Sequence, residues 1–197
     1  MLITNDFEVA EPADDVWRFF DDIPQVAACL PGAELSDQTS ENSFEGGVAI
    51  RLGPVRLEFG GTATITERDD ANRRIVVDAS GADVKGRGQA AMLLTATVAN
   101  TSSGSRVEVS IDLTLSGAAA QYGRGMVSDV TSVLMDDFAT NMTNRVDAIR
   151  RGVSPDQIDT VKPAGGLVIA FRAARMALAR VLGRFFLPYR PPAATNA

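Results

Sequence analysis

The sequence contains no histidine and only one cysteine, and these two absences exclude several kinds of chemistry. Without histidine the usual zinc sites cannot form, and no imidazole is present to act as a general acid or base. The single thiol, that of Cys29, cannot form a disulfide within the chain. Because no histidine is present to activate this thiol, we expect it to be structural and buried. We therefore predict neither a catalytic set nor a metal site.

The chain also lacks the features of a secretory leader. Residues 1–6 run directly into a strand pattern, with no basic segment followed by a long apolar run. The cytoplasm is therefore the expected compartment.

Adjacent acidic pairs occur four times but do not predict paired catalytic carboxylates. Neighbouring residues on a helix point about 100° apart, and turn residues are solvated. Helix ends and surface are the expected settings of these pairs, which are Asp14–Asp15, Asp21–Asp22, Asp69–Asp70 and Asp136–Asp137.

The net charge of −6 is distributed very unevenly along the chain. Residues 1–160 hold all 25 acidic residues and 13 of the 19 basic ones, whereas residues 161–197 hold six basic residues and no acidic one. An acidic body is thus followed by a basic tail.

The longest helical pattern covers residues 115–152. Its apolar residues recur at steps of three and four, which predicts a helix with one long apolar face; they are Met126, Val130, Val133, Leu134, Phe138, Met142, Val146 and Ile149. Arg150 and Arg151 suit the negative end of the helix dipole, and Gly152 suits the C′ position. Asp129 is expected on the polar side.

Before this helix the pattern changes to the period of two that is typical of strands. A first strand over residues 2–9 is followed by two short helices, and the alternating segments after them have short connections, with Gly53–Pro54 as one hairpin turn. These segments are residues 44–52, 55–65, 74–82, 87–98 and 106–115. We predict an α+β fold in which a curved sheet with about six antiparallel strands after the short helices wraps around the long helix. Glycines in the strands, such as Gly46–Gly47 and Gly60–Gly61, favour bends over phosphate binding.

Three segments carry a resemblance to a known family: DVWRFFDDIPQVAACLPGAE, the turn Cys29–Gly32 within it, and GAAAQYGRG before the long helix. Over residues 1–152 the chain resembles the helix-grip fold of START-type (SRPBCC, Bet v 1-like) proteins, and within it the CoxG family of carbon monoxide dehydrogenase subunits. The resemblance implies a cavity between sheet and helix that binds an apolar or amphipathic small molecule. It also implies partnership with a carbon monoxide dehydrogenase-like enzyme or a hydrogenase at the membrane.

Given that fold, apolar side chains facing inward are candidates to bind such a ligand. They are Phe20, Leu30, Val48, Ile50, Leu57, Phe59, Met92, Leu94, Tyr122, Met126, Val130, Leu134 and Phe138. From periodicity alone, the same residues could equally pack into a dry core. Arg124 is compatible with a ligand headgroup or with solvent at the start of the helix.

The basic tail predicts a second functional element. Residues 153–164 indicate a linker, and residues 165–190 show the pattern of a basic amphipathic helix. The residues predicted to contact a membrane are Leu167, Phe171, Arg172, Arg175, Leu178, Arg180, Leu182, Arg184 and Phe185. Spanning a bilayer would cost about 2.5–3.5 kcal/mol for each buried arginine, so a helix lying in the interface is favoured. Docking on a partner protein or on the acidic body is the alternative.

Together these expectations describe a non-enzymatic binding protein on the inner face of the cell membrane. The ligand implied is menaquinone, another quinone or an isoprenoid lipid, with no covalent cofactor and no nucleic acid. The protein would link the partner oxidoreductase to the respiratory quinone pool. One rival is an anchor, scaffold or maturation factor without a ligand, and another is an enzyme of the same fold, for which Tyr122 and Arg124 are the available groups.

Overall fold

The structure is a computed structural model that describes residues 1–52, 55–154 and 158. The predicted tail helix over residues 165–190, with all its candidate membrane residues, lies outside the described residues, as does the turn Gly53–Pro54. No helix in the described part of the chain combines the length and the apolar content that crossing a membrane requires.

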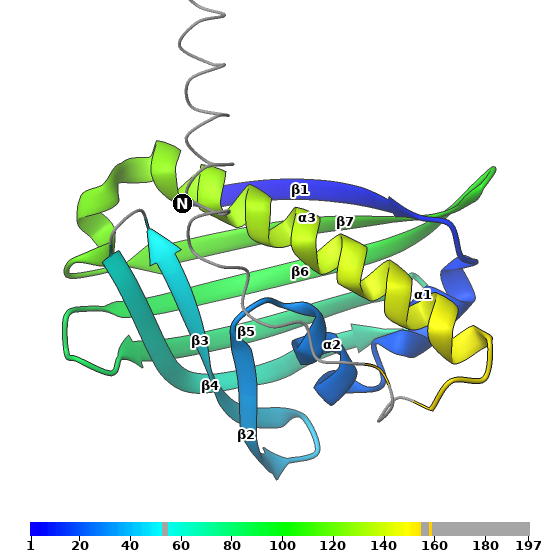
Figure 1. Ribbon diagram of the computed structural model, residues 1–197, viewed down its shortest axis with the longest axis horizontal. Coiled ribbons are helices and arrows are strands. Elements are labelled where there is room, and N and C mark those ends of the chain that lie inside the picture. Colours follow the sequence, from blue (N-terminus) through cyan, green and yellow to red (C-terminus); the bar gives the residue numbers. More distant parts are fainter. Residues whose placement is uncertain (53–54, 155–157, 159–197) are drawn as a thin grey trace, which may run out of the picture.

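A seven-stranded antiparallel sheet curves around one long helix, α3 (Gly123–Arg150), which lies diagonally across its concave face (Figure 1). The spatial order of the strands is β1-β7-β6-β5-β4-β3-β2. In chain order the elements are β1 (Leu2–Val9), α1 (Ala13–Phe19), α2 (Ile23–Cys29), β2 (Ala33–Ser40), β3 (Ser43–Leu52), β4 (Val55–Asp69), β5 (Arg74–Asp83), β6 (Gln89–Thr101), β7 (Gly104–Leu115), the short 3₁₀ turn η1 (Ala119–Tyr122) and α3. The predicted α+β fold with a sheet wrapped around a long C-terminal helix is confirmed.

Strand bounds differ from the predicted ones by a few residues, as in β4, which runs to Asp69 and not to residue 65, and two larger differences concern β2 and the start of α3. Strand β2 was not placed from the sequence, because its residues after Ala33 are exposed and show no apolar alternation. The long helix starts at Gly123 and not near residue 115, because Gly117 and Gly123 have positive φ angles of 65° and 72° that interrupt the helical backbone.

The C-terminus of α3 is formed as predicted. Gly152 has a φ of 84°, its N–H donates to the carbonyl of Ile149 at 2.9 Å, and the N–H of Val153 donates to the carbonyl of Ala148 at 3.0 Å. This is the Schellman arrangement, which satisfies carbonyls that would otherwise be unpaired. Along the helix, three expectations were wrong: Met126 and Ile149 of the apolar face are 44% and 37% exposed, and Asp129 is buried.

The acidic pairs take up helix-end and surface roles in the main. Asp14 pairs with Arg73 at 2.6 Å, Asp15 with Arg18 at 3.1 Å, and Asp22 caps α2 by accepting from the Gln25 N–H at 3.1 Å. Asp70 accepts from the indole Nε1–H of Trp17 at 2.9 Å, and the Arg68 guanidinium lies 4.4 Å from the Trp17 ring centroid. These contacts attach α1 to the β4–β5 turn.

The hydrophobic interior divides into two clusters of unequal size. The larger cluster joins α1 and α2 to β1, β5–β7 and the C-terminal half of α3. The smaller one contains only four fully buried residues, Leu57, Ala119, Val130 and Leu134, beneath the N-terminal half of α3. Packing is therefore dense at one end of the helix and sparse at the other, and the cavity described next is bordered by the smaller cluster.

Candidate ligand-binding site

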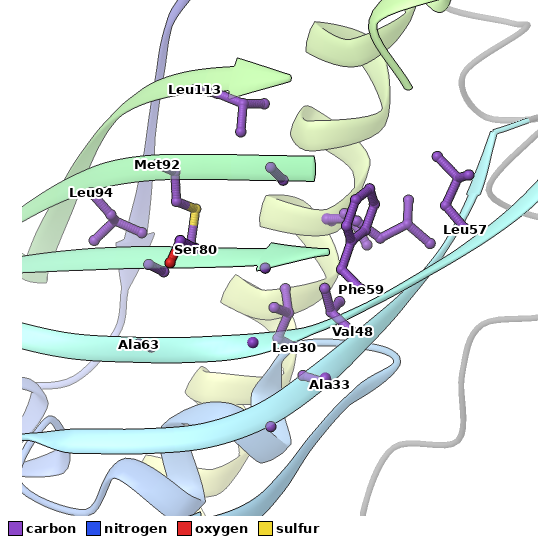
Figure 2. Close-up of a pocket in the computed structure, with 18 of the residues that line it drawn as sticks. Leu30, Ala33, Val48, Leu57, Phe59, Ala63, Ser80, Met92, Leu94 and Leu113 are labelled. Atoms are coloured by element: carbon purple, nitrogen blue, oxygen red, sulfur yellow. The ribbon is translucent and has the colours of Figure 1, made fainter. Parts of the chain in front are cut away.

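A cavity of about 360 Å³ lies between the sheet and the N-terminal half of α3 (Figure 2). Its walls come from β2–β7, the end of α2, η1 and α3. Nearly all lining side chains are apolar; the polar ones are Glu34, Thr62, Ser80 and Thr131. Thr131 already donates from its hydroxyl to the carbonyl of Val127 at 2.9 Å. The volume equals that of about twelve waters at roughly 30 Å³ each.

Nine of the thirteen predicted ligand-binding residues line this cavity. They are Leu30, Val48, Ile50, Leu57, Phe59, Met92, Leu94, Val130 and Leu134. Of these, only Leu57, Val130 and Leu134 are fully buried, and the other six are partly exposed. Partial exposure of inward-facing apolar side chains is what an open space produces and what a close-packed core would remove.

Three of the other predicted residues lie elsewhere. Phe20 is buried in the larger cluster, with its ring 6.2 Å from that of Trp17, and Phe138 contacts Phe7 edge-on at 6.1 Å. Met126 is 44% exposed at the start of α3. Periodicity places Met126 and Phe138 on the apolar face of the long helix but does not show which part of that helix lies over the cavity. Phe20 lies at the end of α1. Tyr122 belongs to η1, and its side chain is outside the described residues. Arg124 is exposed and does not line the cavity.

Small residues that the sequence reasoning did not select create much of the space. One row of register partners across β3–β6 is Gly46, Gly61, Gly81 and Ala90, and the next row, which extends to β7, is Phe44, Ala63, Ala79, Met92 and Leu113. All nine residues line the cavity. Six of the nine are glycine or alanine, so the middle of the inward face carries little side-chain volume. This row of small side chains can be recognised only when the strand register is known, because a single glycine or alanine within one strand does not indicate a cavity.

The glycines of these rows also allow the strands to approach closely. A Cβ on Gly61 would overlap the Ser80 carbonyl oxygen and lie 2.5 Å from the Cα of Gly81, and one on Gly46 would lie 2.5 Å from the Glu34 carbonyl oxygen. Close approach is a second role for these glycines, and their part in bending the sheet stays a prediction.

The end of the sheet beside the cavity is held by a buried carboxylate, that of Asp83. Its oxygens accept from Arg87 Nε and Nη2, both at 2.7 Å, and from the N–H of Glu58 at 3.2 Å and of Lys85 at 3.1 Å. The bonds from Arg87 hold the pKa of the Asp83 carboxyl well below its usual range. Asp83 therefore stays ionised and fixes the β5–β6 turn against β4.

The thiol of Cys29 is fully buried and donates to the carbonyl of Gln25 at 3.3 Å. Burial raises the pKa of this thiol to about 12, and the nearby Arg145 offsets the effect only in part. The expectation of a buried structural thiol is thus confirmed. Within the described residues no group of three or more carboxylates and thiols is close enough together to hold a metal ion.

Comparison with solved structures shows the same fold in proteins of low sequence identity. A conserved protein from Geobacillus kaustophilus superimposes with a TM-score of 0.66 at 15% identity, covering 75% of this chain and 95% of that one. An aromatase/cyclase from a Streptomyces species gives 0.57 at 13% identity, covering 78% and 98%. Norcoclaurine synthase from Thalictrum flavum gives 0.50 at 17% identity, covering 78% and 88%. A search of curated sequences finds no significant match.

At the level of sequence, the family model of CoxG, a subunit of carbon monoxide dehydrogenase, matches residues 6–147. The match covers the whole sheet except the first residues of β1, and all but the last turn of α3. The chain therefore belongs to the CoxG family of carbon monoxide dehydrogenase subunits.

Proposed function

We propose that this protein binds an isoprenoid quinone, menaquinone or a similar lipid, in the cavity beneath α3. It carries the quinone between the cytoplasmic membrane and a carbon monoxide dehydrogenase-like or hydrogenase oxidoreductase. The observation that carries the proposal is the cavity itself, a space of about 360 Å³ with almost wholly apolar walls. Ligand sites usually measure roughly 300–1,000 Å³, so this one is large enough for a small ring system but not for a long chain.

The size of the cavity indicates how such a ligand would lie. Room for about twelve waters holds a ring system or a few isoprene units, and the remainder of the isoprenoid chain must leave the cavity. Met92 and Met135 among the lining residues can adjust their side chains to different ligand shapes. A partly enclosed ligand suits a carrier, because the ligand must leave again when the partner enzyme is reached.

The chemistry of the walls supports carriage over catalysis. Glu34 is the only charged residue that lines the cavity among those described, and it is exposed at the edge strand β2. The remaining polar side chains there are serine and threonine hydroxyls, which are weak acids and bases. Two structural neighbours are enzymes by their names, a cyclase and a synthase, but the likeness at 13% and 17% identity extends to the fold alone. We therefore propose a non-enzymatic role.

The tail supplies the attachment to the inner face of the membrane in this proposal. Its predicted helix carries Arg172, Arg175, Arg180 and Arg184 beside apolar residues. Each arginine near an anionic surface contributes roughly 1 kcal/mol.

The proposal is tested by native mass spectrometry and lipid extraction of the full-length protein purified from its own host. We expect about one quinone per chain, and we expect the empty protein to extract quinone from liposomes. The matched variant lacks residues 153–197 and should keep the cavity but lose membrane attachment. A full-length protein that contains and extracts no quinone or other lipid would sink the carrier role; continued attachment to liposomes would then favour an anchor, scaffold or maturation factor.

A further inference from the structure

Two connections, the β5–β6 turn and the segment from β7 to η1, lie with the start of α3 at one end of the sheet, at the left in Figure 1. Arg87 Nη2 donates to the Arg56 carbonyl at 2.9 Å, which joins the β5–β6 turn to the start of β4. The Ala118 N–H donates to the Arg87 carbonyl at 2.7 Å, which joins the same turn to the segment leading into η1. The β5–β6 turn is therefore hydrogen-bonded both to β4 and to the segment before η1.

The surface is basic although the body of the protein is acidic. Its five basic residues, which we call the basic rim, are Arg51, Arg56, Lys85, Arg87 and Arg124. The described residues among 50–58, 83–89 and 115–126 contain these five and only two acidic residues, whereas the rest of the described chain has eight basic and 21 acidic residues. The charge of the body is thus strongly polarised along α3.

The two acidic residues of this end are already paired with the rim. Glu58 pairs with Arg56 at 2.7 Å and Asp83 with Arg87 at 2.7 Å. Arg51, Lys85 and Arg124 are exposed and form no ion pair with another described residue. Three positive charges at this end are therefore available to an anionic partner.

Exposed apolar side chains lie among these charges. Val84 is 63% exposed in the β5–β6 turn, and Met126 is 44% exposed one turn into α3. The cavity reaches the same end, because Leu57 and Val127, which directly follow Arg56 and Met126 in the chain, line it. Cations interspersed with apolar side chains are the combination that binds the interface of an anionic bilayer.

We propose that the basic rim is the surface by which the domain docks on an anionic lipid bilayer, with the rim end of the cavity facing the lipid. The inference rests on the proposed function, since an apolar ligand that is extracted from a bilayer needs a route that avoids water. It goes beyond that function by assigning a second membrane contact, independent of the tail, and by fixing the orientation of the domain.

The orientation is tested on the full-length chain with a polarity-sensitive fluorophore attached to a single introduced cysteine. Val84→Cys places it in the rim, and Ser102→Cys places it in the exposed β6–β7 turn at the opposite end. Cys29 stays unlabelled because its thiol is buried. With vesicles containing phosphatidylglycerol we expect a blue shift at position 84 and none at 102. Phosphatidylcholine vesicles should give no blue shift at either position. Added salt should reverse the shift that anionic vesicles cause at position 84.

A charge variant measures the strength of the contact. Replacing Arg51, Lys85 and Arg124 by Gln should weaken binding to the anionic vesicles by on the order of 100-fold. The matched control replaces Arg18, Arg106 and Arg151, three exposed arginines paired with Asp15, Asp6 and Asp147 towards the opposite end, and should change binding much less. Equal weakening by both variants, or a stronger response at position 102, would overturn the proposal.

The outcomes separate this inference from the proposed function. If the chain carries quinone but the label at position 84 shows no blue shift on anionic vesicles, rim docking is refuted and the carrier role stands. A chain whose label at position 84 responds but which never contains quinone supports the docking surface and refutes the carrier role.

Discussion

Filling the cavity should abolish ligand binding without unfolding the protein. Ala63 and Ala79 are register partners on β4 and β5, and both line the cavity. The double variant Ala63→Leu with Ala79→Leu adds six carbon atoms. At roughly 30 Å³ per atom, by analogy with water, these remove about 180 Å³, half of the space.

The energetic consequence follows from the apolar contacts that the ligand loses. Each ligand carbon excluded from the cavity forfeits about 0.8 kcal/mol, so six carbons correspond to about 5 kcal/mol and a loss of affinity on the order of a thousandfold. The free energy of unfolding should change by less than about 2 kcal/mol, because burial of the new side chains offsets their packing strain.

The assay is calorimetric titration with a short-chain naphthoquinone, together with the amount of quinone that copurifies with the chain. The matched control is Ala91→Leu with Ala99→Leu, two exposed positions on β6 that do not line the cavity. Unchanged affinity in a folded Ala63→Leu, Ala79→Leu variant would refute the assignment of this cavity as the binding site.

Three further predictions test the fold around the site. Gly61→Ala should lower the free energy of unfolding by about 2–4 kcal/mol, since its Cβ would overlap the Ser80 carbonyl. The Cβ in Gly60→Ala meets nothing within 4 Å, so this control should lower it by less than about 1 kcal/mol. Urea unfolding measures both, and equal losses would contradict the close approach of β4 and β5. Burial raises the pKa of Cys29 from 9.0 to about 12, so the thiol contributes stability that is fully present below pH 9 and is lost as pH rises towards 12. Cys29→Ala should therefore reduce the fall of the urea midpoint at alkaline pH. An identical fall in the variant would argue against this pKa shift. Arg68→Ala should lower the free energy of unfolding by about 0.5–2 kcal/mol and shift the fluorescence of Trp17 to the red. The variant loses the guanidinium 4.4 Å from the Trp17 ring and its ion pairs with Asp21 and Asp70. Unchanged emission would mean that the contact does not persist in solution.

Most of the fold could be predicted because its strands are half-buried and therefore alternate. Strand β7 shows why, since Val107, Val109 and Ile111 are all buried on one face while Glu108 and Asp112 are exposed. Strand β2 shows the limit, because an exposed edge strand such as AELSDQTS has no apolar face to reveal it. The start of α3 was misplaced for a related reason, as the composition of residues 115–122 suits a helix and only the positive φ angles of Gly117 and Gly123 exclude one.

The site was half predictable for a different physical reason. Large apolar residues such as Phe59 and Leu134 are found from their pattern alone, and they do line the cavity. A cavity is also defined by what is missing, and the small side chains of Ala63, Ala79 and Gly81 come together only through strand register. Phe20 and Phe138 were assigned to the cavity wrongly because periodicity cannot distinguish the dense end of the core from the sparse one.

The basic rim lies at the N-terminal end of α3, and the tail follows its C-terminal end in the chain. This arrangement constrains how both can contact the same membrane. A helix of 28 residues is about 42 Å long, and the tail begins beyond its C-terminus, while the rim surrounds its N-terminus. The predicted linker, residues 153–164, spans at most about 43 Å when fully extended. A domain standing upright on its rim would thus need nearly all of that length, whereas a domain tilted so that α3 lies closer to the bilayer plane would need far less. Simultaneous contact through rim and tail therefore favours a tilted domain, and shortening the linker should oppose upright docking more strongly than tail binding.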